Sequence, residues 1–356
     1  MKILIIYDHS APKYHRLLLP MVYMPGIEIV STHQITEALC QDIDILYFNR
    51  LILGCAIAQV LAWRKAYGFK IVVDFDDHWN LEKDHYLYEA YQQQKLPLFM
   101  IAWLDEADAV TVTHERLAND VMPVNQNVHV LPNAIPKEGQ FLAQRQPKPR
   151  IRVGENPVEL TRLFWAGGLT HQKDIGLLRY PVRSFKDLPI QMVMGGYSKT
   201  SVYHKMRNDF TNYGKLPHEL LEALPVNDYY YMYSKCDIAL IPLTESTFNS
   251  HKSNLKILEA ANIGANVVVS NVHPYKDVPF VNYVDTPDDW RRHVKWILDN
   301  PAAAQEQALN LQQYCDERFN FTKINKTRKE ILCSLTTDKH LKPSDPITLT
   351  GQSTNA

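Results

Sequence analysis

Three consecutive stretches decide the fold of this chain: CDIALIPL at residues 236–243, FNSHKSNLKILE at 248–259 and AANIGANVVVS at 260–270. The two apolar runs predict strands, and the polar segment between them predicts a loop followed by a helix. We expect Ser253 to cap this helix, which would begin near Asn254. Strand, loop, helix and strand in this order form the repeating unit of a parallel α/β sheet.

The same alternation runs through the whole chain. Further strands are predicted at residues 3–7, 27–30, 45–48, 71–73, 109–113, 128–131, 163–166 and 190–194. Helices are predicted at 55–67, ending at Gly68, at 86–106 and over 288–332. This pattern predicts an α/β protein with two doubly wound, Rossmann-like domains.

The chain is too long for one hydrophobic core, and its composition divides it near the middle. Five prolines lie within residues 132–157, interspersed with Lys, Arg and Gln, which is poor material for a packed element. We therefore predict a first domain at 1–140, a linker at 141–160 and a second domain at 161–335, whose last helix crosses back onto the first domain. The polar residues 336–356 are predicted to form a flexible tail.

Composition excludes several classes of protein. Of the 356 residues, 46% are hydrophobic and 22% are charged, as in folded globular proteins rather than disordered or fibrous ones. Lys and Arg number 38 against 39 Asp and Glu, so no overall basic field attracts nucleic acid or anionic lipid. The five widely spaced cysteines fit a reducing compartment, and we expect a cytoplasmic protein. No apolar stretch reaches the ~20 residues that span a bilayer, whereas peripheral membrane contact and the oligomeric state stay open.

The start of the helix after Ser253 is a candidate phosphate site. The first backbone N–H groups of a helix have no partner within it, and the helix dipole adds about half a positive charge at that end. Lys252 stands beside the same helix start and adds a full cation. We therefore expect Lys252, Ser253, Asn254 and Leu255 to hold a diphosphate.

The segment 248–270 resembles the donor-binding motif of the family-4 retaining glycosyltransferases, which have the GT-B fold of two Rossmann-like domains facing a central cleft. In that motif a Glu, seven residues and a second Glu precede an apolar helix end and a Gly. Glu259 matches the second Glu, and the resemblance implies that it accepts hydrogen bonds from the ribose hydroxyls of a nucleotide sugar. His251 stands where the first Glu contacts the donor sugar, so we treat His251 as a catalytic candidate and leave the sugar open.

A second resemblance to this family lies in LFWAGGLTHQKD, residues 163–174. It looks like the strand and glycine-rich loop that open the family's nucleotide-sugar-binding domain. The resemblance implies that Gly167 and Gly168 approach the donor and that Lys173 binds its diphosphate. The family usually has an Arg directly after the first Gly, whereas this chain has Gly168 there, so one phosphate contact is absent or comes from elsewhere.

The acceptor side is less clearly marked. The segment VDFDDHW, residues 73–79, lies at the carboxyl end of a predicted strand, where ligands of open α/β sheets gather. Asp76, Asp77 and His78 are our candidates for orienting the acceptor hydroxyl or stabilising charge. The Asp-x-Asp spacing at 74–76 is also that of a divalent-metal site in single-domain GT-A transferases. We favour a site without metal, because the helix start already provides for the phosphates.

Two further groups of residues have less specific patterns. The loop after the first strand faces the cleft in this architecture, and five of its residues are candidates for contacting the acceptor or the donor phosphate: His9, Lys13, Tyr14, His15 and Arg16. The tyrosines Tyr229–Tyr231 and Tyr233 have helical spacing, and we assign them to packing against the sheet rather than to the site.

Together these resemblances imply a hexosyltransferase-like glycosyltransferase, which transfers a sugar from a nucleotide-diphosphate sugar to an acceptor hydroxyl with retention of configuration. No cofactor other than the nucleotide sugar is expected. The acceptor stays open among a glycan, a lipid, a protein and a modified nucleic acid. The alternatives are a noncatalytic nucleotide- or sugar-binding protein of the same fold and a nucleotide-sugar epimerase.

Overall fold

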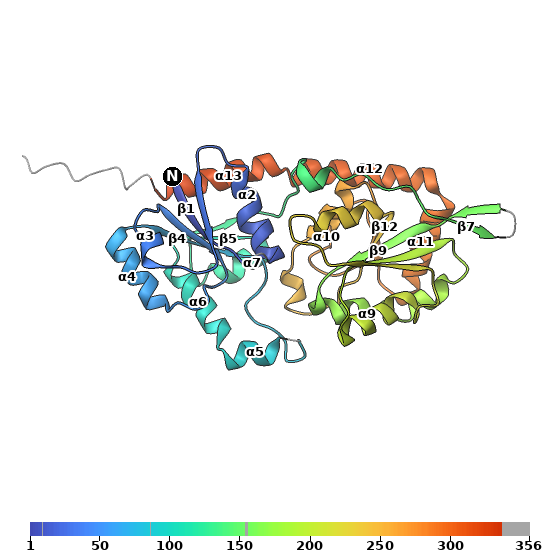
Figure 1. Cartoon of the computed structure of the whole chain (residues 1–356), viewed down its shortest axis with the longest axis horizontal. Helices are drawn as coiled ribbons and strands as arrows, with labels where there is room; N and C mark the ends of the chain where they lie inside the picture. Colours follow the sequence, from blue (N-terminus) through green and yellow to red (C-terminus); the bar gives the residue numbers. More distant parts are fainter. Residues whose placement is uncertain (9, 86, 154–155, 337–356) are drawn as a thin grey trace, which may run out of the picture.

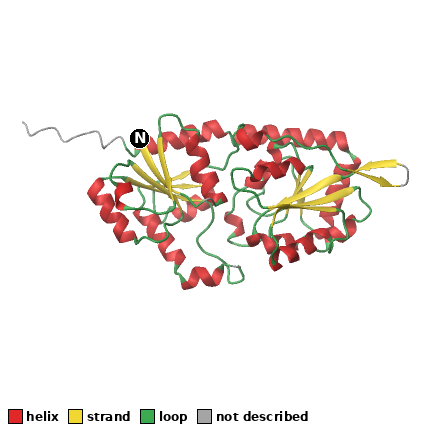
Figure 2. Ribbon diagram, in the orientation of Figure 1, coloured by secondary structure: helices red, strands yellow, loops and turns green. Residues whose placement is uncertain are grey.

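The protein has two α/β domains that lie side by side along the long axis of the molecule (Figure 1). The computed structural model describes residues 1–8, 10–85, 87–153 and 156–336. Each domain is built around one parallel sheet flanked by helices (Figure 2). The predicted fold class, α/β with two doubly wound Rossmann-like domains, is confirmed.

The sheet of the first domain has the order β2-β1-β3-β4-β5-β6, and all neighbouring strands are parallel. Its strands are β1 (Lys2–Ile6), β2 (Glu28–Thr32), β3 (Ile45–Asn49), β4 (Lys70–Phe75), β5 (Ala109–Val112) and β6 (Val128–Val130). Every residue of β3 is buried, because both faces of the sheet are covered. The strand order reverses between β1 and β3, which makes a switch point where ligands of such sheets bind.

The sheet of the second domain has the order β11-β10-β9-β12-β13-β14 and is also parallel. Its strands are β9 (Thr161–Ala166), β10 (Ile190–Tyr197), β11 (His218–Glu222), β12 (Ile238–Ile241), β13 (Asn266–Ser270) and β14 (Asn282–Val284). Here the order reverses between β9 and β12. The loops that follow these two strands therefore flank the second switch point.

Helices connect the strands in both domains. The first domain contains α1 (Ala11–Lys13), the π-helical turn η1 (Tyr14–Leu18), α2 (Leu19–Val22), α3 (Glu37–Cys40), α4 (Ile57–Tyr67), α5 (Tyr88–Gln93), α6 (Leu96–Glu106) and α7 (Glu115–Val121). The rest of the chain contains α8 (Gln172–Gly176), α9 (Ser201–Thr211), α10 (Leu255–Asn262), α11 (Pro287–Asp299), α12 (Pro301–Arg318) and α13 (Phe321–Ser334). Short 3₁₀ turns are η2 (Gly139–Leu142), η3 (Leu169–His171), η4 (Pro181–Phe185), η5 (Tyr229–Lys235) and η6 (Asn249–His251). None of the helices in the described ranges combines the length and the apolar character needed to cross a membrane.

Two local details follow from backbone chemistry. Gly68 adopts the left-handed conformation with φ of 70° and caps α4, as predicted. The helix predicted over 86–106 is instead two helices, α5 and α6. They separate at Lys95, which has a φ of 53°, and Pro97 lies in the first turn of the second helix, where its missing N–H costs nothing.

The segment between the two sheets is more ordered than its composition suggests. Within the predicted linker 141–160, β7 (Arg150–Val153) and β8 (Asn156–Glu159) pair as an antiparallel hairpin. The boundaries that we placed at 140 and 160 stay predictions. The predicted tail falls, apart from Thr336, on residues 337–356, which lie outside the described part of the chain.

The last helix, α13, returns to the first domain (Figure 1), as expected. Asn325 donates a hydrogen bond of 2.7 Å to the carbonyl of Pro20, and Lys329 donates one of 2.6 Å to the carbonyl of Pro25. Arg328, which is 3% exposed, donates to the carbonyl of Arg16. A segment from the far end of the sequence therefore completes the surface of the first domain.

Candidate functional site

The two domains meet at the carboxyl edges of their sheets, which we call the domain junction. Asp120 of α7 contacts His251 of η6 there, and the backbone N–H of Phe248 donates a hydrogen bond of 2.8 Å to the carboxylate of Glu82. Two predicted residues also approach one another across this junction, because the rings of His78 and His251 have centres 4.8 Å apart.

The predicted phosphate site lies at the start of α10. Asn254 is the N-cap of this helix, but its side chain makes no capping hydrogen bond. The cap predicted for Ser253 is wrong, because Oγ of Ser253 accepts a hydrogen bond of 2.8 Å from Nδ2 of Asn133. The helix start, with Leu255 as its first residue, therefore has no side-chain cap and can receive an anion.

Two lysines flank this helix start: Lys252 precedes the N-cap, and Lys256 lies in the first turn of α10. Nζ of Lys252 lies 4.8 Å from the ring centre of Phe248, and Nζ of Lys256 lies 5.3 Å from the ring centre of Trp165. Burial lowers the pKa of Lys256 to about 8; Asp174 opposes this shift and the charge of Lys252 adds to it. Lys256 was not among the residues predicted for this site, because Lys252 lies in extended backbone before the helix and no helical spacing links the two lysines. An anion bound between the two ammonium groups would relieve their repulsion.

Lys173 reaches across the domain junction. It forms an ion pair with Asp84, and the Lys173 side chain is 51% exposed. An exposed pair of this kind contributes little to stability, so it can be broken at low cost. A diphosphate would therefore compete with Asp84 for Lys173, and the predicted diphosphate role of Lys173 stays a prediction.

The glycine-rich loop follows β9, as predicted. A Cβ at Gly167 would lie 2.8 Å from the ring of Trp165 and 3.1 Å from that of His171, so a larger residue would displace both rings. A Cβ at Gly168 would meet nothing within 4 Å. Gly168, which stands where the resembled family usually has Arg, thus borders open space that a phosphate can enter.

Glu259 is held by tyrosines that we had assigned to packing. The hydroxyl of Tyr233 donates a hydrogen bond of 2.6 Å to Oε2 of Glu259, and the hydroxyl of Tyr229 donates one to Oε1. These two tyrosines therefore belong to the site, which their helical spacing alone did not reveal. Because each carboxylate oxygen has two lone pairs, Glu259 keeps acceptor capacity for further hydroxyls.

The surroundings of Glu259 are buried and largely uncharged. Burial raises the pKa of Glu259, while the hydrogen bonds from Tyr229 and Tyr233 and the charge of Lys256 oppose this shift. His15 lies 2.9 Å from the Tyr229 hydroxyl and 3.9 Å from Glu259. Burial, assisted by the charge of Arg16, lowers the pKa of His15 to about 4, so His15 is neutral at pH 7 and its contact with Glu259 is not an ion pair.

The buried His15 makes the stability of the protein depend on pH. Its pKa is about 4 in the folded chain and 6.5 in the unfolded chain, so below pH 6.5 the unfolded chain binds a proton that the folded chain does not. Stability should fall as the pH falls from 6.5 to 4, by roughly 3 kcal/mol for this one residue. Urea unfolding at pH 7 and at acidic pH would measure the loss, which should be smaller in the His15→Gln variant. Equal losses in the two proteins would contradict this prediction.

On the acceptor side, Asp76 and Asp77 face Arg50. Nε of Arg50 lies 3.4 Å from Asp76, and Nη1 lies 3.8 Å from Asp77. Burial tends to raise the pKa of Asp76, but Arg50 and a hydrogen bond of 2.9 Å from Asn49 outweigh it and hold the pKa below its usual range. Burial raises the pKa of Asp77, against the charge of Lys252 from the second domain.

Asp74 serves the core rather than the site. Nη2 of Arg16 lies 2.8 Å from Oδ2 of Asp74, and the hydroxyl of Thr111 donates a hydrogen bond of 2.6 Å to the same oxygen. Arg16 is 1% exposed and Asp74 is fully buried, so the expectation that Arg16 contacts a ligand is wrong. The Asp-x-Asp spacing therefore directs its two carboxylates toward two arginines, Arg16 and Arg50. His9, named with Arg16 in the same loop, lies outside the described residues.

The candidates His78 and His251 lie together, with ring centres 4.8 Å apart. Asp120 touches both: its Oδ2 lies 2.7 Å from Nε2 of His251 and 3.5 Å from Nε2 of His78. Burial lowers the pKa of His78, and the neighbouring His251 adds to this effect. Asp120 was missed because a single Asp on a helix carries no sequence signal for a partner in another domain.

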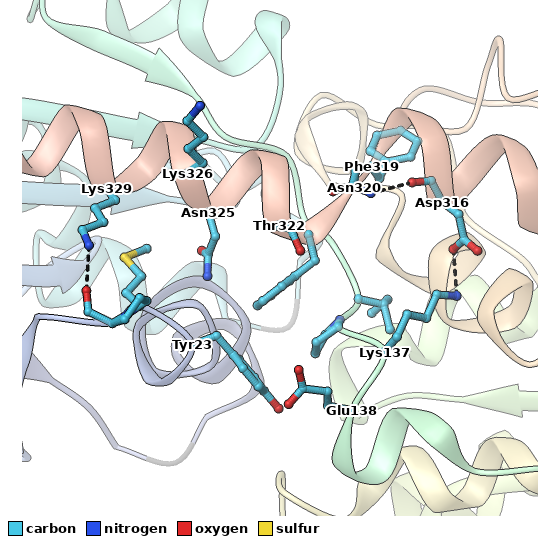
Figure 3. A pocket seen from close by; sticks show the side chains of 15 residues that line it. Tyr23, Lys137, Glu138, Asp316, Phe319, Asn320, Thr322, Asn325, Lys326 and Lys329 are labelled. Atoms are coloured by element: carbon cyan, nitrogen blue, oxygen red, sulfur yellow. Dashed lines mark hydrogen bonds and ion pairs between the residues drawn. The ribbon is translucent and has the colours of Figure 1, made fainter.

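A cavity of about 660 Å³ lies at the crossover from α12 to α13, and none of its lining residues is a predicted site residue (Figure 3). Tyr23 of the first domain and Lys137 and Glu138 of the connecting segment form part of its wall. Nζ of Lys137 lies 2.7 Å from Oδ1 of Asp316 in α12. This cavity belongs to the connection between the domains and not to the candidate site.

Comparison with known proteins gives structural matches without sequence matches. No protein-family model matches the sequence, and no curated protein matches it either. The structure is similar to sucrose-phosphate synthase from Thermosynechococcus elongatus, with a TM-score of 0.65 and 14% identity over 94% of this chain and 99% of that one. It is also similar to HepE from Anabaena, solved with UDP-glucose, with a TM-score of 0.63 and 13% identity over 94% of this chain and 100% of that one.

A third similar structure is an alpha-glucosyltransferase solved with UDP and a 13-mer DNA containing an HMU base. The TM-score is 0.61 and the identity 13%, over 94% of this chain and 99% of that one. Each of these matches runs through both Rossmann-like domains. The protein therefore has the GT-B fold, as the resemblance of its donor motif implied.

Proposed function

We propose that the protein is a glycosyltransferase that binds a nucleotide-diphosphate sugar at α10 and transfers the sugar to an acceptor held by the first domain. The observation that carries this proposal is the pair Lys252 and Lys256 at the uncapped start of α10, beside the glycine loop of β9. Solved structures of the same fold, HepE and the alpha-glucosyltransferase, contain UDP-glucose or UDP, which supports this choice of donor.

The donor side places positive charge where the reaction develops negative charge. As the bond between sugar and diphosphate breaks, negative charge grows on the diphosphate, and the two lysines and the helix dipole stabilise it. An anion beside Lys256 raises the pKa of that ammonium from about 8 and keeps it charged. Glu259 accepts hydrogen bonds from the ribose hydroxyls with the lone pairs that Tyr229 and Tyr233 leave unused.

The acceptor side offers Asp76, Asp77 and His78. Asp77 is best suited to orient an acceptor hydroxyl, because burial raises its pKa and Arg50 lies closer to Asp76 than to Asp77. Retention of configuration is part of the proposal and rests on the resemblance of segment 248–270. A cytoplasmic location is also proposed, on the five widely spaced cysteines. The acceptor itself can be a glycan, a lipid, a protein or a modified nucleic acid.

One observation favours a second candidate, a noncatalytic nucleotide- or sugar-binding protein. His251 replaces the Glu that contacts the donor sugar in the resembled family, and both of its ring nitrogens lie 2.7 Å from oxygens of the protein itself. Such a site binds a nucleotide but has lost a contact to the transferred sugar. A nucleotide-sugar epimerase is the third candidate and differs in needing no acceptor.

The experiment that tests the proposal is a panel of nucleotide sugars added to the purified protein, with thermal shift and nucleoside-diphosphate release as readouts. One donor should stabilise the protein and be consumed. The Lys252→Ala/Lys256→Ala variant should bind that donor about 10- to 100-fold more weakly, since it loses two charge-assisted contacts. Lys295→Ala, which removes a surface lysine from α11, is the matched control.

Each competing function has its own outcome in this panel. Stabilisation by a nucleotide without any turnover, across all acceptor classes, would favour the noncatalytic protein. A changed sugar formed from the donor alone would favour the epimerase. No response to any nucleotide or nucleotide sugar would contradict both the proposed donor site and the proposed function.

A further inference from the structure

Side chains of the first domain form hydrogen bonds to the short segment 248–252 that leads into α10. At the start of α7, Nε2 of the N-cap His114 lies 2.9 Å from the carbonyl of His251, and Arg116 donates a hydrogen bond of 3.2 Å to Oγ of Ser250. From the loop after β4, Glu82 accepts the hydrogen bond from the Phe248 N–H. This segment of the second domain is thus hydrogen-bonded to two separate elements of the first.

Asp120 of the first domain also contacts this segment, through the side chain of His251. Nε2 of His251 lies 2.7 Å from its carboxylate, and the side chain of Asp120 is 38% exposed while that of His251 is 5% exposed. Nδ1 of His251 lies 2.7 Å from the carbonyl of Thr247. Both ring nitrogens therefore face acceptor oxygens, so the His251 ring is fixed in orientation and has no nitrogen left for a ligand.

The position of His251 determines where Lys252 lies. Lys252 is the next residue and one of the two cations at the start of α10, and its backbone N–H donates a hydrogen bond of 3.2 Å to the carbonyl of Asn249. Residues 249–251 form the turn η6, so a displacement of His251 moves the turn and Lys252 together. The charged and titratable groups that face this segment from the first domain include Asp120, His78, His114, Arg116 and Glu82, and those from the second domain include His273 and Asp174.

We propose that Asp120 is a positioning residue for the donor site: by contacting Nε2 of His251 with its carboxylate and lying beside His78, it fixes segment 248–252 to the acceptor-side domain and sets the position of Lys252. The role assigned to Lys252 rests on the proposed function, whereas the fixing of the segment does not. Asp120 thereby links closure of the two domains to assembly of the diphosphate site. It acts through His251 and does not itself touch the donor.

Amide hydrogen exchange of the full chain, without ligand, tests the fixing of the segment. Asp120→Ala should speed exchange of the amides of Phe248 and Lys252 about tenfold, because the contact between this carboxylate and His251 is lost from the junction. Glu115→Ala, at an exposed position at the start of the same helix, should leave this exchange unchanged. Asp120→Asn keeps an acceptor oxygen and should give an intermediate rate.

A second variant separates positioning from a general loss of stability. If Asp120 acts through His251, the variant Asp120→Ala/His251→Gln should exchange no faster over 248–252 than either single variant. With any donor that the wild type consumes, Asp120→Ala should raise the KM about tenfold and change kcat much less. Unchanged exchange at 248–252, or faster exchange spread evenly over both domains, would overturn the proposal even if the protein proves to be a transferase.

Discussion

Replacing Arg16 with Ala is expected to lower the free energy of unfolding by about 3–5 kcal/mol, which is the cost of leaving one charge of a buried pair without its partner. Asp74 is fully buried and accepts hydrogen bonds from both Nε and Nη2 of Arg16. Arg16 also donates a hydrogen bond of 2.6 Å to the carbonyl of Leu131 and one of 3.1 Å to Asn133. The substitution therefore takes a donor away from a carboxylate, a carbonyl and an amide oxygen.

Equilibrium unfolding in urea would measure this loss. The matched control is Lys295→Ala, which breaks an exposed pair with Asp299 and should cost no more than about 0.5 kcal/mol. The variant Arg16→Met/Asp74→Asn removes both charges and should be less destabilised than Arg16→Ala, because no charge stays buried alone. If Arg16→Ala proved as stable as the control, the buried ion pair between Arg16 and Asp74 would not form in solution.

Replacing Glu259 with Gln is expected to lower kcat/KM for the donor about 10- to 100-fold, since each hydrogen bond to a charged acceptor contributes about 1.5–3 kcal/mol, one to a neutral acceptor about 1 kcal/mol, and two ribose hydroxyls are involved. Gln has the shape of Glu, and its amide can still meet the hydroxyls of Tyr229 and Tyr233. The fold should therefore survive. Steady-state kinetics with the donor found in the panel would measure the effect, which should lie mainly in KM.

The control for Glu259→Gln is Tyr233→Phe. This variant removes one hydroxyl that binds Glu259 but leaves the carboxylate in place. It should retain donor binding within about threefold, because the lost hydrogen bond is replaced by one from a ligand or water. Equal losses in the two variants would mean that Glu259 serves the tyrosine cluster and not the donor.

The sequence predicted most of the fold because parallel strands covered on both faces are continuously apolar. β3, β12 and β13 were recognisable in this way. β11 was missed because it lies at the sheet edge and reads HELLE, with no β-branched residue. β14 was missed because it has only three residues, one of them Asn.

The candidate site was predictable only where its residues lie close together in the sequence. Lys252 and the start of α10 lie within one short segment, so their association could be inferred from spacing. The contact between Asp120 and His251 joins elements of different domains, and no local pattern connects them. For Arg16 the sequence predicted a ligand contact that the structure does not contain. Its position after the first strand suggested that it faces a ligand, whereas its guanidinium points into the core and binds Asp74.

The return of α13 to the first domain has a consequence for the order in which the protein is made. Chains emerge from the ribosome starting at the N-terminus, and domains generally fold as they emerge. Here the surface around Pro20 and Pro25 stays uncovered until residues 325–329 have been synthesised. The first domain to be translated is thus the last to be completed, and its exposed patch must be tolerated, or shielded by a chaperone, while the whole second domain is made.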